Sequence, residues 1–145
     1  MMRGTKYLIV AAFAGALFAC NEPIPDADVQ AAKQAIAQAE SAKADKYDPD
    51  NLSKAKEAYR DSLKRIADSD TGNARDAALD ARRIADLATD NSRKKVAEDT
   101  TASAEKMIRE AIDRKAEYLA ADDLARARAK LEDAKNALDQ KKWLE

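Results

Sequence analysis

Residues 73–117 read NARDAALDARRIADLATDNSRKKVAEDTTASAEKMIREAIDRKAE, a stretch that holds neither glycine nor proline. Small or apolar residues recur in it at intervals of three and four, which is typical of an amphipathic helix. These residues are Ala74, Ala77, Ala81, Ile84 and Ala88, then Ala97, Thr101, Ala104, Ile108 and Ala111, and the pattern continues to Tyr118 just after the stretch. The stretch therefore predicts one long helix from Asn73 to Glu117, about 65 Å in length.

The segment TDNSRKK, residues 89–95, is polar throughout and interrupts this pattern. Because it contains no helix breaker, we expect the helix to continue through it. The segment would then lie exposed or project past the shorter helices. A kink near Asn91 is the alternative.

Two shorter helices are expected before the long one. Asp48-Pro49 is typical of a helix N-cap followed by proline at the first helical position, and residues 68–72 (DSDTG) are a turn cluster. We therefore expect helices from Asp26 to Lys46 and from Pro49 to Asp68. Their apolar faces carry Val29, Ala32, Ile36 and Ala39 on the first helix, and Leu52, Ala55, Tyr59, Leu63 and Ile66 on the second.

A short pattern returns late in the chain. Residues 50–55 (DNLSKA) recur as residues 122–127 (DDLARA), 72 positions further on, and Tyr47 matches Tyr118 if one residue is skipped. We therefore predict an all-α fold, an antiparallel helical bundle or helical-hairpin repeat with one long helix and a thin, alanine-rich core.

The same pattern bears on the end of the chain. Residues 141–145 fall where the next helix of a second copy would begin. We therefore expect a fragment, or a version without its closing helix, in which Trp143 and Leu144 are exposed or frayed.

Composition excludes several classes of function. The chain has no histidine and one cysteine, and its 26 basic and 27 acidic residues give a net charge of -1. There is no Ser-His or Cys-His pair and no imidazole metal site. The charges are interleaved rather than clustered, unlike a nucleic-acid-binding surface. We expect no enzyme, no cofactor, no metal and no nucleic-acid partner.

The N-terminal residues predict the cellular location of the protein. Arg3 and Lys6 precede a short apolar run over residues 7–19, too short to span a bilayer as a helix but typical of a secretory signal. The run ends in Leu17-Phe18-Ala19-Cys20, which resembles the lipobox of bacterial lipoproteins. The resemblance implies cleavage between Ala19 and Cys20 and lipidation of Cys20.

These features divide the chain into three parts. We expect a signal peptide over residues 1–19, a lipidated cysteine and tether over residues 20–25, and an alanine-rich helical domain over residues 26–145. Two or more acyl chains on Cys20 would make a durable membrane anchor.

The pattern around Tyr47-Asp48-Pro49 and Leu52-Ser53-Lys54-Ala55 is similar to a family of bacterial lipoproteins with an alanine-rich helical domain of unknown function. The resemblance implies an anchor in the outer membrane facing the periplasm, which Asn21 after the cysteine also favours. Some members accompany peptidoglycan-binding modules.

The predicted function is a membrane-anchored, non-catalytic structural or protein-interaction module with an envelope protein as partner. Tyr47 and Tyr118 are the candidate interaction residues, although both could instead join helices at their turns. The alternatives are a binding module for peptidoglycan or a small envelope ligand, and self-association through a coiled coil formed by residues 97–118.

Overall fold

The computed structural model describes residues 25–142, and every regular element within them is a helix. The leader, Ala19, Cys20, Trp143 and Leu144 lie outside the described residues. The helices are α1 (Asp26–Ser41), α2 (Ala44–Tyr47), α3 (Pro49–Ala67), α4 (Thr71–Asp113), α5 (Ala116–Leu119) and α6 (Ala121–Asp139). The expected all-α class with one long helix is confirmed. No described helix combines the length and apolarity that crossing a membrane requires.

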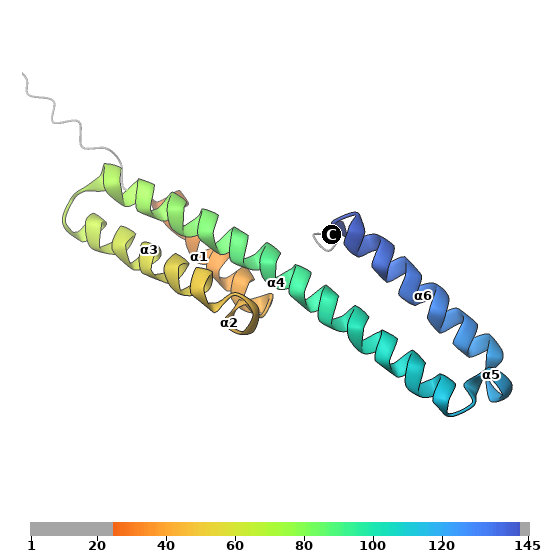
Figure 1. Cartoon of the computed structure of the whole chain (residues 1–145). Coiled ribbons are helices and arrows are strands. Elements are labelled where there is room, and N and C mark those ends of the chain that lie inside the picture. Colours follow the sequence, from red (N-terminus) through yellow and green to blue (C-terminus); the bar gives the residue numbers. More distant parts are fainter. Residues whose placement is uncertain (1–24, 143–145) are drawn as a thin grey trace, which may run out of the picture.

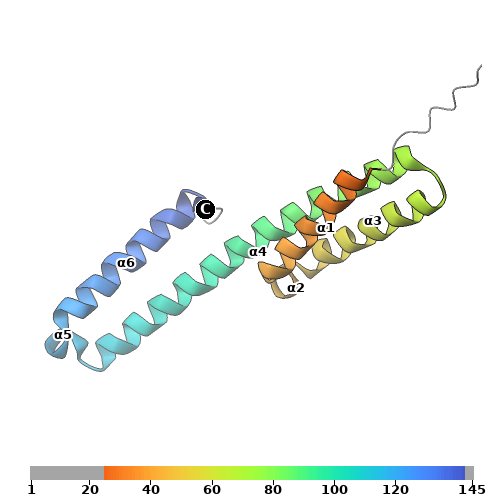
Figure 2. The same cartoon turned by 180° about the vertical axis from the view of Figure 1, so that it is seen from behind.

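The long helix α4 organises the fold. Its 43 residues run without interruption through residues 89–95, as predicted. Helices α1 and α3 pack along its first half, residues 71–95, and α6 folds back along its second half, residues 96–113 (Figures 1 and 2). The helix ends at Asp113 rather than Glu117, because Lys115 takes a left-handed conformation with φ of 65°.

The predicted single helix from Asp26 to Lys46 is wrong, because the chain turns after Ser41. Lys43 is left-handed, with φ of 65°, and its N–H donates to the carbonyl of Glu40 at 3.0 Å. Such a helix end usually takes glycine or asparagine. A lysine there gives no signal in the sequence. The start of α3 is as predicted, since Asp48 caps the helix and Pro49 opens it.

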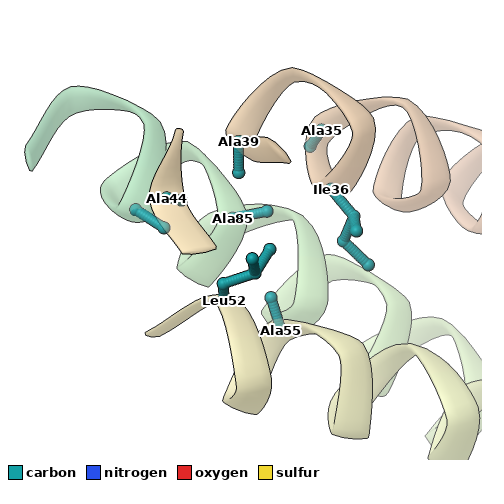
Figure 3. Close-up of a cluster of buried hydrophobic side chains, with 8 residues drawn as sticks. Ala35, Ile36, Ala39, Ala44, Leu52, Ala55 and Ala85 are labelled. Atoms are coloured by element: carbon teal, nitrogen blue, oxygen red, sulfur yellow. The ribbon is translucent and has the colours of Figure 1, made fainter. Parts of the chain in front are cut away.

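The core lies between α1, α3 and the first half of α4, and it is largely alanine. Figure 3 shows Ile36 of α1, Leu52 of α3 and Ala85 of α4 gathered from the three helices. Ala32, Ala39 and Ala55 are each fully buried. Since alanine adds only one carbon beyond the backbone, the helices approach closely and leave little room for a larger side chain.

Two details of the predicted faces are wrong. On α4 the predicted Ala74, Ala81 and Ala88 are buried, but Ala78 and Ala85 are buried beside them, whereas the predicted Ala77 and Ile84 are only half-buried. On α3 the predicted Leu63 is 42% exposed. Its neighbour Ser62 is fully buried instead. In both helices, small side chains lie at the line of closest approach and the larger ones lie beside it, where there is room.

The backbone geometry of α1 to α3 recurs 72 residues later. Lys43 and Lys115 (115 minus 43 is 72) both have φ of 65°, and they precede the four-residue helices α2 and α5. Helices α3 and α6 both have 19 residues, and their first residues, Pro49 and Ala121, differ by the same 72.

Candidate functional site

The turn between α2 and α3 is joined to α4 by Tyr47. Its hydroxyl donates to Asp99 Oδ2 at 2.7 Å and accepts from Lys46 Nζ at 2.8 Å. Lys46 Nζ also lies 4.4 Å from the centre of the tyrosine ring. The hydrogen bond to Tyr47 raises the pKa of Lys46 above its ordinary value. Tyr47 is half-buried, and its bond to Asp99 joins α2 to α4 at this turn.

Asp48 makes a second connection to α4. Its carboxylate accepts from the Asn51 backbone at 3.4 Å, from the Asn51 side chain at 2.8 Å and from Asn91 Nδ2 at 2.6 Å. Burial raises the pKa of this carboxyl, but the hydrogen bonds from Asn51 and Asn91 outweigh it, and the net pKa is lowered. The charged form of Asp48 therefore holds the α2–α3 turn against α4.

The expectation that residues 89–95 are exposed is wrong in part. Thr89 is 5% exposed and donates to the carbonyl of Ala85, and Ser92 is fully buried. Small hydroxyl side chains fit a close helix contact much as alanine does. Asn91 and Asp99 are contact residues that the sequence did not indicate, because their partners lie 43 and 52 residues away along the chain.

The second half of α4 has a different environment, because α5 and α6 lie along it, and α2 reaches it at its start through the bond from Tyr47 to Asp99. Glu105 Oε1 and Lys135 Nζ lie 2.7 Å apart and connect α4 to α6. The hydrogen bond from Lys135 lowers the pKa of Glu105, and the hydrogen bond to Glu105 raises the pKa of Lys135. Both side chains are partly exposed, 42% for Lys135 and 32% for Glu105, so solvent screens this pair and it orients the helices more than it stabilises them.

An open apolar groove runs between α4 and α6. It consists of three successive hollows of about 280, 270 and 290 Å³. Met107, Ile108 and Leu124 line the hollow nearest α5. Ala104, Leu131 and Ala134 line the middle one. Ala97 and Leu138 line the third. These residues form an open and largely apolar surface between the two helices.

The groove residues correspond to the core of the N-terminal part. Each core residue of α1 to α3, moved by 72 positions, falls on a residue that lines one of the hollows. Six pairs carry the same amino acid: Ala32 and Ala104, Ile36 and Ile108, Ala39 and Ala111, Ala44 and Ala116, Leu52 and Leu124, and Ala55 and Ala127. The same kind of surface is thus covered in one part and open in the other.

Tyr118 lies apart from the groove lining and is 87% exposed. Since α2 and α5 have equal lengths, the residue of α5 in the position of Tyr47 is Leu119, and the one-residue gap assumed in matching the tyrosines is wrong. Leu119 is 82% exposed. Tyr47 and Tyr118 are therefore not equivalent, since Tyr47 is half-buried and bonded to Asp99, whereas Tyr118 is exposed.

Within residues 25–142, no group of acidic side chains is arranged to hold a metal ion. No family model, curated protein or solved structure matches the chain. Any functional assignment therefore depends on the groove and on the N-terminal motif.

Proposed function

We propose that this chain is a bacterial envelope lipoprotein whose helical domain is a non-catalytic protein-interaction module. The lipid on Cys20 would hold the domain close to the membrane, on the periplasmic face of the outer membrane. Support for the anchor comes from the sequence, in which the single cysteine stands at the end of the lipobox Leu17-Phe18-Ala19-Cys20.

The open groove between α4 and α6 carries the interaction part of the proposal. Met107, which lines it, is 66% exposed although it is a large apolar residue. Exposed apolar surfaces of this kind mark sites for a partner. The hollows have few polar atoms to orient a small ligand. Among the residues that the structure describes, their only polar lining residues are Thr100, Thr101, Asp123, Lys130 and Lys142. This composition favours a polypeptide partner over a sugar.

We further interpret the offset of 72 residues as a repeated helical hairpin. In the first copy, α1 and α3 are covered by the first half of α4. In the second copy, the second half of α4 takes the place of α1, and α6 takes the place of α3. The surface that would be the second copy's core is the open groove.

The anchor is tested by Cys20→Ser in the full chain, with Ala14→Ser as a control that leaves the lipobox intact. We expect the Cys20 variant to leave the membrane fraction or to accumulate as uncleaved precursor, while the control behaves like the wild type. Unchanged processing and partitioning of the Cys20 variant would refute the lipoprotein assignment.

The interaction is tested by placing a photo-crosslinking amino acid at Met107, in the groove, or at Asp133, exposed on α6 outside it. We expect an adduct with a different polypeptide from position 107 and none from position 133. Equal adducts at both positions, or none, would refute the interaction proposal. An adduct of two identical chains would favour self-association, and one carrying muropeptides would favour peptidoglycan binding.

A further inference from the structure

We propose that the open groove binds a single amphipathic helix of another polypeptide, one whose contact face is a stripe of alanine-sized residues. This helix would lie against α4 and α6 as the first half of α4 lies against α1 and α3. The inference rests on the proposed interaction function and specifies the chemistry of the partner.

The first step is the likeness of the two surfaces. Lys43 and Lys115 share a left-handed conformation, and each is followed by a four-residue helix and a 19-residue helix. With the same backbone path and the same residue at six contact positions, the two surfaces offer similar shapes.

The second step is what covers the first surface. Five alanines of α4 meet α1 and α3, and all five have no exposed area: Ala74, Ala78, Ala81, Ala85 and Ala88. They alternate at spacings of four and three, so one straight helix brings them all to one face. Because the groove has a shape similar to that of the surface formed by α1 and α3, we infer that it is covered by a similar element. That element is a helix with small residues at this spacing.

The third step concerns the width of the groove. Its sides carry Ala104 and Ala111 from α4, and Ala127 and Ala134 from α6. Side chains this short let a covering helix bring its backbone close, provided that its own contact residues are also small. A second copy of the chain that packed groove against groove would bring Met107 and Leu131 of both chains into the contact, and the size of these side chains would hold the two surfaces apart.

The groove also differs from the first surface in ways that set its preference. Met107 takes the position of Ala35, and Leu131 takes the position of Tyr59. The hollow nearest α5 therefore has a larger lining side chain on the α4 side than the first surface has at the same position. The middle hollow has no hydroxyl where the first surface carries that of Tyr59. We infer a contact stripe like that of residues 74–88 but not identical to it.

The test uses a synthetic peptide with the sequence of residues 71–95 as the probe. The peptide carries a fluorescent label and is titrated with the full chain held in lipid nanodiscs, and the anisotropy of the label is recorded. We expect saturable binding of one peptide per chain. A peptide with Ala81→Lys and Ala85→Lys should bind at least about tenfold more weakly, because two long charged side chains would enter the apolar contact.

Two protein variants locate the site. Ala104→Lys places a charge in the groove, and Ala102→Lys places the same charge on the exposed side of the same helix. We expect the first to weaken peptide binding at least about tenfold and the second to leave it unchanged. Circular dichroism of both variants verifies that they remain helical, and the altered peptide tests the contact without changing the protein.

Absence of peptide binding, or binding that survives both Ala104→Lys and the altered peptide, would overturn the inference. A dimer in light scattering that Ala104→Lys dissociates would also overturn it, since a second copy would then occupy the groove. In either case the crosslinking at Met107 decides separately whether the groove is an interaction site. If the peptide binds but crosslinking gives no adduct, the proposed function fails while the chemistry of the groove stands.

Discussion

Ala55→Leu and Ala127→Leu should affect stability very differently. Both residues are the seventh of a 19-residue helix, so the change in helix propensity, about 0.2 kcal/mol, is the same for both. Ala55 has no exposed area and lies in the core cluster of α1, α3 and α4. Ala127 is half-buried and faces the open groove.

The expected difference follows from close packing. Three additional carbons at position 55 have no space between helices separated by alanine, and overpacking of this kind costs about 1–3 kcal/mol. At position 127 the same carbons enter an open hollow, over which no third helix of the described residues packs. We therefore expect a loss of about 2 kcal/mol for Ala55→Leu and less than about 0.5 kcal/mol for Ala127→Leu.

Thermal unfolding of residues 26–145, followed by ellipticity at 222 nm, measures the difference. A change of 2 kcal/mol corresponds to a shift of about 8 °C in Tm for a domain of this size. Equal losses in the two variants would show that the groove is closed and would refute the comparison of the two surfaces. No loss in Ala55→Leu would refute the close packing of the alanine core.

Three further predictions concern the contacts around α4. Asp48→Ala should lower the free energy of unfolding by about 1–2 kcal/mol through loss of the N-cap. Hydrogen bonds from Asn51 and Asn91 lower the folded-state pKa of Asp48 despite its burial. The contribution of Asp48 to stability should therefore be full above the unfolded pKa of about 3.9 and should vanish as the pH falls through the folded pKa. Urea titrations at several pH values would measure this loss. Ser92→Ala should increase the free energy of unfolding by about 1 kcal/mol and thereby raise Tm, because Ser92 Oγ is buried without a hydrogen-bond partner among the described residues. Ser62→Ala, which removes the bond from Ser62 Oγ to the Tyr59 carbonyl, should give no such gain, and a gain in both would contradict the explanation. Tyr47→Phe should cost less than about 1 kcal/mol by removing the bond to Asp99, whereas Tyr118→Phe should leave Tm unchanged, and equal effects would contradict the distinction between the two tyrosines.

The sequence by itself determined the helical class, the long helix and the start of α3. Alanine content and the absence of glycine and proline from residues 73–113 act locally, and the Asp48-Pro49 cap needs only three neighbouring residues. The faces of α1 were also predictable, since Val29, Ala32, Ile36 and Ala39 are all buried. Local preferences of this kind are readable because each depends on residues within one or two turns of helix.

Only the tertiary structure decided which small residues lie at the contacts and where α1 ends. Alanine is compatible with a buried or an exposed position, so its spacing could not distinguish Ala77 from Ala78. The left-handed Lys43 carries no sequence signal, and the bonds from Asn91 and Tyr47 to their partners join residues more than 40 positions apart. The groove is likewise a tertiary feature. Ala55 and Ala127 are the same residue in the same local pattern, and only the presence of a third helix makes one core and leaves the other as surface.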